Sequence, residues 1–167
     1  YNIPVVEDAA EAFGSLYKNR HLGTFGKIGV FSFNGNKIIT TGGGGMVITD
    51  DKKLAYLIKH LSTTSKIKHE YEFYHDQVGF NYRLPSINAC LGIGQLEKIK
   101  SMLLSKNKLN KIWKKLFNDT NFYLYEPIPE STPNYWINNL ILNNKNERNL
   151  TLKYTNERQV MTRPFWK

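Results

Sequence analysis

Hydrophobic positions along the chain form short continuous runs in some stretches and helix-spaced patterns in others. The short runs cover residues 3–7, 29–33 and 45–49. Continuous apolar runs of this length are typical of buried strands in parallel sheets. Residues 52–61 instead carry leucine and isoleucine at helical spacing, and the Asp pair before them can cap a helix. Strands that alternate with helices in this way predict an α/β layer.

The second part of the chain predicts a long helical stretch followed by a smaller unit. Residues 62–77 are polar and aromatic without a clear period, and we expect a loop there. Helical spacing begins at residues 85–86 and continues, or restarts, to residue 115. Three prolines then indicate a linker, and residues 135–142 alternate enough to form a strand. We expect two domains, residues 1–118 in the α/β layer and residues 119–167 as the beginning of an α+β piece.

Charge and composition exclude several classes of protein. The net charge of +9 is compatible with nucleic-acid binding, but 18 of the 23 cations are Lys, whereas forks to bases and phosphates favour Arg. We therefore expect a basic surface and no nucleic-acid partner. No run of about 18 apolar residues exists, so no membrane association is expected. Cys90 is the only cysteine and no export signal is visible, so the expected location is the cytoplasm.

Lys37 and Asp8 are the candidate reactive residues. Lys37 lies between the apolar residues 30–33 and the pair Ile38 and Ile39, and a lysine in apolar surroundings can act as an amine nucleophile on a carbonyl. An exposed lysine in a turn is the alternative. Asp8 ends a strand, where ligand sites of α/β sheets lie, and a structural cap is the alternative. An enzyme that uses pyridoxal 5′-phosphate (PLP) needs such a lysine and carboxylate, together with phosphate donors.

The glycine run and the histidines match no specific motif. Residues 42–45 are four glycines, whose backbone can approach a phosphate or another chain closely. No Lys-Ser or Lys-Thr follows them as in a P-loop, and Val47 stands where the dinucleotide fingerprint has its third glycine. A tight turn into the strand at residues 45–49 is equally compatible. The four histidines lack the spacing of a zinc site, so no metal-binding residue is expected.

Four ordered motifs resemble the DegT/DnrJ-type nucleotide-sugar aminotransferases. They are residues 6–14 (VEDAAEAFG), 22–26 (LGTFG), 31–42 (FSFNGNKIITTG) and 79–84 (GFNYRL), and the resemblance extends over nearly the whole chain. It implies an α/β fold that forms part of the large PLP-binding domain of a fold-type I aminotransferase, followed by the start of a smaller α+β C-terminal domain.

The resemblance implies a role for each matching residue. Lys37 matches the catalytic lysine that binds PLP covalently, and Asp8 matches the carboxylate that hydrogen-bonds the pyridinium nitrogen. Ser32 matches a hydroxyl donor to the cofactor phosphate, and Glu11 occupies a position near the cofactor ring that holds Gln, His or Glu in the family. Asn81 matches a residue that reaches the phosphate in the neighbouring subunit, which implies a homodimer in the full-length form.

The resemblance also implies a substrate class. Gly44 replaces a Glu found in many members, and this four-glycine form is similar to the bacillosamine-pathway branch. Those enzymes transfer an amino group from L-glutamate to C4 of a UDP-linked 4-keto-6-deoxy-N-acetylhexosamine, for bacterial surface glycans. A related dehydratase subgroup has His at the lysine position, so Lys37 favours transamination. In the family context four residues are candidates for binding the nucleotide-sugar: Arg83, Trp136, Arg163 and Trp166.

The two ends of the chain suggest a piece of a longer protein. The sequence begins with Tyr1 rather than Met, its first element is already apolar, and its last residues carry no signal that ends an element. The alternative to an active enzyme is therefore a truncated, catalytically inactive remnant of one.

Overall fold

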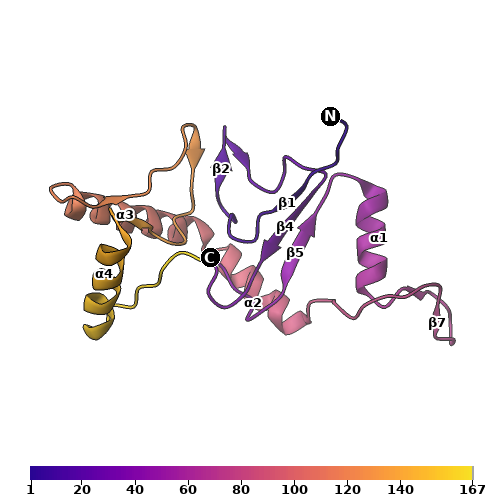
Figure 1. The fold of residues 1–167 in the computed structure, drawn as a ribbon. Helices are drawn as coiled ribbons and strands as arrows, with labels where there is room; N and C mark the ends of the chain where they lie inside the picture. Colours follow the sequence, from indigo (N-terminus) through magenta and orange to yellow (C-terminus); the bar gives the residue numbers. More distant parts are fainter. Residues whose placement is uncertain (167) are drawn as a thin grey trace. The chain divides into compact units, whose positions relative to one another are not determined.

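The structure is a computed structural model that describes residues 1–166. The chain packs into two compact units (Figure 1). The first contains Tyr1–Lys106 and Pro127–Trp136, and the second contains Asn107–Glu126 and the described residues from Ile137 onward. The expected domains 1–118 and 119–167 stay a prediction, and Lys167 at the end of the second lies outside the described residues.

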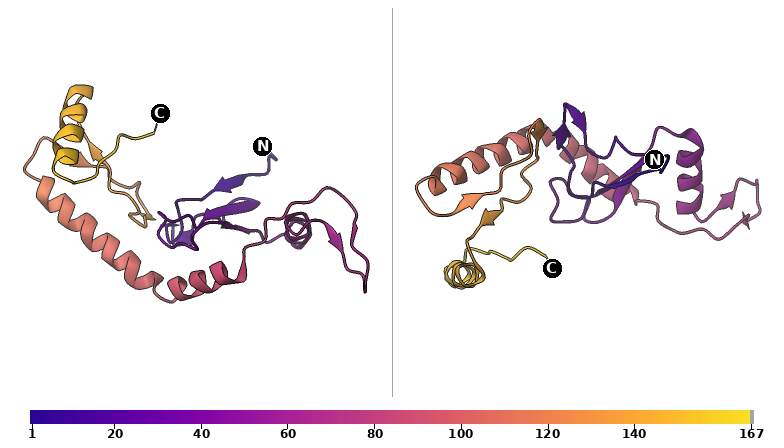
Figure 2. Two further views of the ribbon diagram at one scale, coloured as in Figure 1. Left: turned by 90° about the horizontal axis from the view of Figure 1, so that it is seen from below. Right: turned by 45° about the horizontal axis from the view of Figure 1, so that its top comes forward.

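A three-stranded sheet organises the first unit. Strand β4 (Ile28–Ser32) lies between β1 (Val6–Asp8) and β5 (Gly45–Ile48), and Figure 2 shows the three side by side. β1 runs parallel to β4, with Asp8 opposite Val30, whereas β5 runs antiparallel to β4. All three strands predicted from the apolar runs are confirmed. The parallel pair brings the carboxyl ends of β1 and β4 to one edge of the sheet.

The hydrophobic core lies against β4 and the segments that follow β1 and β4. Phe31 and Phe33 are two residues apart, so their side chains leave the same face, and both are buried with Ile39 and Ala9. The ring of Phe13 meets Phe31 and Phe33 edge to face, with centroids 5.3 and 5.7 Å apart. These contacts hold the chain after β1 against the chain after β4, which is where the candidate residues lie.

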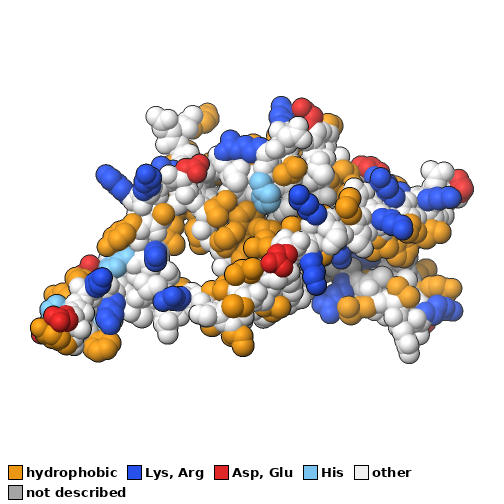
Figure 3. All heavy atoms as spheres, turned by 180° about the vertical axis from the view of Figure 1, so that it is seen from behind, with side chains coloured by type: hydrophobic (Ala, Val, Ile, Leu, Met, Phe, Trp, Pro, Cys, Tyr) orange, Lys and Arg blue, Asp and Glu red, His pale blue; other side chains and the backbone are white. Residues whose placement is uncertain are grey.

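The expectation that the first strand is buried is wrong. Ile3, Val5 and Val6 are 72, 56 and 61% exposed. β1 is an edge strand of the described sheet and has a neighbour on one side only, so part of its apolar surface faces solvent. On the face drawn in Figure 3, hydrophobic side chains reach the surface beside Lys and Arg side chains.

The helices agree with the predicted helical stretches. α1 (Lys52–Ser62) begins after Asp51, whose Oδ1 accepts two backbone N–H groups of the first turn at 2.9 and 3.2 Å. The later stretch forms two helices rather than one, α2 (Ser86–Leu96) and α3 (Ile99–Phe117). Within residues 1–166, no helix is both long and apolar enough to cross a bilayer.

Most of the remaining elements were not predicted, although β10 lies within the strand expected at residues 135–142. The remaining elements are β2 (Leu16–Tyr17), β3 (Arg20–His21), β6 (Lys66–Ile67), β7 (Tyr74–His75), β8 (Tyr123–Leu124), β9 (Ser131–Thr132), β10 (Leu140–Ile141) and α4 (Lys145–Glu157). β6 and β7 pair inside the expected loop, and β9 pairs with β2, which returns residues 127–136 to the first unit. α4 follows Asn144, whose side chain accepts the Glu147 N–H at 3.0 Å, a capping signal that the sequence carries.

The prediction of a strand over residues 135–142 is largely wrong. Only β10, Leu140–Ile141, forms there. Tyr135 has a φ of +49°, and Asn134 Oδ1 accepts the Trp136 N–H at 2.9 Å, so the chain turns where the pattern predicted extension. This turn is the feature that directs Trp136 towards the site described below.

The loop at residues 23–26 is held against the sheet by hydrogen bonds to the side chain of Glu7. Its carboxylate accepts the N–H of Gly23 at 2.7 Å and also the N–H of Gly26. A Cβ atom on Gly29 of β4 would lie 1.9 Å from the Gly23 carbonyl oxygen, so only glycine permits this approach. The carboxylate therefore ties the loop at residues 23–26 to β1 and β4.

We expect Glu7 to make stability depend on pH. Burial alone would raise the pKa of this carboxyl group, but N–H groups of Gly26, Gly23 and Phe25 and the charge of Arg20 outweigh it and hold the pKa below its ordinary value. A lowered folded-state pKa contributes stability that is present above the unfolded-state pKa and is lost as pH falls through the folded-state value. Glu7→Gln should therefore reduce the free energy of unfolding by about 1–2 kcal/mol at pH 7.

Denaturant unfolding of both proteins at pH 7 and pH 3 measures this effect. The difference between wild type and Glu7→Gln should shrink at pH 3, because the wild-type carboxylate is then increasingly protonated. A difference of equal size at both pH values would mean that packing, rather than the carboxylate charge, holds the loop.

Candidate active site

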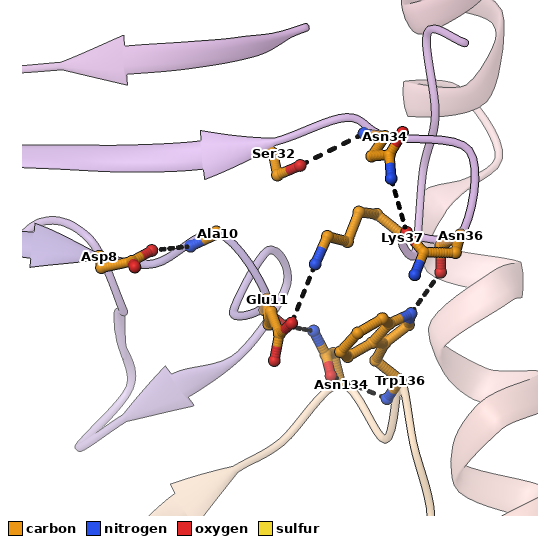
Figure 4. Close-up of polar contacts among 9 residues, drawn as sticks. All are labelled: Asp8, Ala10, Glu11, Ser32, Asn34, Asn36, Lys37, Asn134 and Trp136. Atoms are coloured by element: carbon orange, nitrogen blue, oxygen red, sulfur yellow. Dashed lines mark hydrogen bonds and ion pairs between the residues drawn. The ribbon is translucent and has the colours of Figure 1, made fainter. Parts of the chain in front are cut away.

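Two predicted site residues lie at the carboxyl edge shared by β1 and β4. Asp8 is the last residue of β1 and Ser32 the last residue of β4. Asp8 Oδ1 accepts the Ala10 N–H at 3.1 Å, and Ser32 Oγ accepts the Asn34 N–H at 3.3 Å (Figure 4). Asp8 thus makes the local contact expected of a cap, and its other oxygen and its charge remain available at the sheet edge.

Lys37 and Glu11 are brought together by the turns that follow the two strands. After β1, the Ala12 N–H donates to the Ala9 carbonyl oxygen at 2.9 Å, and this turn carries Glu11. After β4, the Lys37 N–H donates to the Asn34 carbonyl oxygen at 3.0 Å. The Nζ of Lys37 lies 3.0 Å from Glu11 Oε1 (Figure 4). Neither residue is close to the other in sequence, so only the fold makes this ion pair.

The surroundings of Lys37 differ from those predicted. Its side chain is only 14% exposed, which excludes the alternative of a solvated turn lysine. The apolar neighbours Ile38 and Ile39 do not surround its amino group, however, because the side chain extends to the Glu11 carboxylate and to the ring of Trp136. The amine is therefore held as one member of a polar and aromatic cluster.

The sequence did not indicate Asn134 as part of this cluster, and it indicated Trp136 as a candidate for binding the nucleotide-sugar but not as a neighbour of Lys37. Lys37 Nζ lies 4.3 Å from the centroid of the Trp136 ring, and the Trp136 indole N–H donates to the Asn36 carbonyl oxygen. Asn134 Nδ2 donates to the Glu11 carbonyl oxygen at 2.7 Å. Both residues lie about a hundred positions from Lys37, Trp136 inside the strand expected at residues 135–142 and Asn134 just before it, and only the turn-forming character of Asn could have indicated a turn there.

The arrangement fits a cofactor that carries a carbonyl group, a basic ring nitrogen and a phosphate. Lys37 supplies an amine, Asp8 a carboxylate and Ser32 a hydroxyl, all from the segments at one sheet edge. Asp8 and Glu11 border an open hollow of about 350 Å³ whose remaining lining is Ala10, Ala12 and Ser15. Neither Lys37 nor Ser32 is among the residues that line this hollow. This donor set is the one that PLP requires.

The glycine run forms the turn between β4 and β5. Gly42 and Gly44 have φ values of +79° and +91°, which side-chain-bearing residues rarely adopt. The Phe33 N–H donates to the Gly44 carbonyl oxygen at 2.9 Å, and Asn88 Nδ2 of α2 donates to the Thr41 carbonyl oxygen at 2.5 Å. The turn interpretation therefore accounts for the glycines, and α2 fixes the loop that follows Lys37.

Four further predicted site residues belong to segments of the chain other than those that carry Lys37 and Asp8. Asn81 pairs with Thr63 at the base of the β6–β7 hairpin, and it and Arg83 are exposed. Arg163 and Trp166 belong to the second unit, where the Trp166 ring packs edge-on against Phe165. In the part of the chain that the structure describes, no hydrogen bond or ion pair joins Asn81 or Arg83 to Lys37 or Asp8, and no cluster of His, Cys, Asp and Glu could hold a metal ion.

Comparison with known proteins identifies a family that the whole sequence matches. The profile of the DegT/DnrJ/EryC1/StrS aminotransferase family matches residues 1–167. A GDP-perosamine synthase of Escherichia coli O157:H7 is 37% identical over 165 residues, which are 99% of this chain and 45% of that protein. A UDP-4-amino-4,6-dideoxy-N-acetyl-beta-L-altrosamine transaminase of Campylobacter jejuni is 34% identical over 124 residues, which are 74% of this chain and 33% of that protein.

Solved structures show the same fold. Helicobacter pylori PseC, an aminotransferase involved in the biosynthesis of pseudoaminic acid, superimposes with a TM-score of 0.87 and 27% identity. The match covers 93% of this chain and 43% of PseC. The chain thus spans less than half the length of the relatives it matches, and it corresponds to part of the larger domain of their fold.

Proposed function

This chain belongs to the DegT/DnrJ/EryC1/StrS aminotransferase family, and from that premise we propose that it carries the cofactor-binding lysine of a nucleotide-sugar aminotransferase. Aminotransferases of this family depend on PLP. The observation that supports the proposal most directly is the position of Lys37, Asp8 and Ser32 around one edge of the β1–β4–β5 sheet. In this proposal Lys37 is catalytic, and Asp8, Glu11, Ser32 and Asn81 bind the cofactor.

The proposed reaction moves an amino group from L-glutamate to C4 of a UDP-linked 4-keto-6-deoxy-N-acetylhexosamine. A relative named for a UDP-amino-sugar supports the nucleotide, and a relative named for GDP-perosamine supports the competing GDP-linked acceptor. Lys37 supports transamination rather than dehydration, because an amine can both bind a carbonyl compound and carry a proton.

Each of the site residues has a separate role in the proposed reaction. PLP, when bound, supplies a carbonyl group that reacts with amines and a ring that accepts electrons. Lys37 removes the proton from Cα of the amino donor and returns a proton to C4 of the sugar in the opposite half of the cycle. Glu11, 3.0 Å from Lys37 Nζ, holds the amine in its resting position and can accept its proton. The Asp8 carboxylate stabilises the charge of a protonated ring nitrogen.

The remaining predicted residues support a dimeric site. Asn81 and Arg83 lie on the exposed segment beyond the β6–β7 hairpin, so in this proposal they serve the site of a second copy. Arg163 and Trp166 are proposed to contact the nucleotide-sugar, since Arg suits a diphosphate and Trp can stack on a base or sugar. The proposed enzyme is a cytoplasmic homodimer.

Reduction with borohydride tests the proposal. Protein from the complete reading frame that encodes this chain is incubated with PLP, reduced and digested, and the peptides are mapped by mass spectrometry. We expect a phosphopyridoxyl group on Lys37 and none on Lys27, a more exposed lysine that pairs with Asp51 at 2.8 Å. Attachment to another lysine would overturn the role of Lys37. The absence of any attachment would favour the alternative of an inactive remnant.

A further inference from the structure

Asn134 fastens a distant segment of the chain to the turn that carries Glu11. Its backbone N–H donates to Ser15 Oγ at 3.0 Å, and its Nδ2 donates to the carbonyl oxygens of Glu11 and Phe13 at 2.7 and 3.0 Å. Its Oδ1 accepts the N–H of Trp136 at 2.9 Å. The residue is only 6% exposed and has no spare polar atom on its side chain to lose without cost.

Trp136 is held by this turn and by the loop that carries Lys37. Its indole N–H donates to the carbonyl oxygen of Asn36, the residue before Lys37, and its ring lies 4.3 Å from Lys37 Nζ. Figure 4 shows the Lys37 side chain extending to the Glu11 carboxylate, with the Trp136 ring beside them. A cation over an aromatic ring is attracted by the ring, and this attraction acts on the charged amine only.

We propose that Trp136 is a positioning residue for Lys37 and that Asn134 sets the position of Trp136. The ring covers one side of the amine, Glu11 binds the other, and together they hold the side chain in one orientation at the sheet edge. Once the amine loses its proton, both attractions weaken and the amine is released to react. The catalytic meaning of this inference rests on the proposed function, but the contacts themselves exist without cofactor.

The labelling rate of Lys37 tests the inference. Protein from the complete reading frame, prepared without PLP, is treated with a trace amount of acetic anhydride between pH 7 and pH 9.5, and acetylation of each lysine is measured by mass spectrometry. Trp136→Leu should raise the rate at Lys37 by roughly three- to tenfold at pH 7.5, because the uncharged amine reacts and the ring stabilises only the charged form.

Conservative variants distinguish a positioning role of Trp136 from a general contribution to packing. Trp136→Phe keeps the aromatic face and should stay within about twofold of wild type. Asn134→Asp places an oxygen against the Glu11 and Phe13 carbonyl oxygens and should behave like Trp136→Leu. Trp113→Leu, which removes a ring stacked on Phe117, should leave Lys37 unchanged, and Lys27 serves as the internal reference. Equal rates in Trp136→Phe and Trp136→Leu, or no change in either, would overturn the inference.

A second measurement needs no substitution of Trp136. The chain has three Trp, so Trp113→Phe with Trp166→Phe leaves Trp136 as the only indole fluorophore. Adding Lys37→Met should shift its emission, whereas adding Lys27→Met should not, and equal spectra would overturn the inference. Because neither experiment uses PLP, they can succeed when borohydride labelling fails, and failure here leaves the test of the proposed function unaffected.

Discussion

Lys37→Ala is expected to lower amino transfer by roughly 10³-fold or more, since the same amine binds the cofactor and moves the proton. The loss should not reflect unfolding. The deleted ion pair has one largely exposed partner, Glu11 at 49% exposure, and pairs of this kind contribute about 0.2–1 kcal/mol. The thermal unfolding midpoint should therefore stay close to that of wild type.

Formation of 2-oxoglutarate from L-glutamate measures this first prediction, with protein from the complete reading frame and PLP in excess. Lys27→Ala is the matched control, because it also removes an ion-paired lysine of the first unit. Methylamine should restore part of the activity of Lys37→Ala by replacing the missing amine. Activity of Lys37→Ala within tenfold of wild type would contradict the proposed role. Faster transfer to a GDP-linked than to a UDP-linked keto sugar would overturn the proposed acceptor.

Asp8→Asn should reduce amino transfer by roughly 10²-fold or more, because an amide cannot stabilise the charge on the cofactor ring nitrogen. This substitution separates the two interpretations of Asp8. The side-chain oxygen of Asn can still accept the Ala10 N–H, and Asn caps turns about as well as Asp. A structural cap alone therefore predicts unchanged activity, whereas a cofactor ligand predicts a large loss with little change in stability.

Steady-state transfer and thermal unfolding, measured side by side, decide between these outcomes for Asp8. Asp50→Asn is the control, since Asp50 is an exposed acid of the same unit. The affinity for PLP, measured from the change in absorbance during titration, should fall in Asp8→Asn and stay constant in Asp50→Asn. If activity and the unfolding midpoint both stay unchanged in Asp8→Asn, the cap interpretation is the better one.

The local pattern of hydrophobic and polar residues was sufficient to predict much of the secondary structure of the first unit. The apolar runs located β1, β4 and β5, and the spacing of leucine with Asp51 as cap located α1. These elements depend on nearest neighbours and on which face is apolar, and both are visible in one stretch of sequence. Two-residue strands such as β2 and β9 carry no such period, and their pairing is set by contacts between segments far apart in the chain.

The sequence alone determined which chemical groups are available: the amine of Lys37, the carboxylate of Asp8 and the hydroxyl of Ser32, each within or shortly after an expected strand. The tertiary structure alone decided what surrounds the amine. The parallel pairing of β1 with β4 brings the Glu11 turn to Lys37, and the Asn134 turn adds Trp136 from about a hundred residues away. Such contacts could not be predicted from the sequence. They depend on how distant segments of the backbone come together, which no local hydrophobic period encodes.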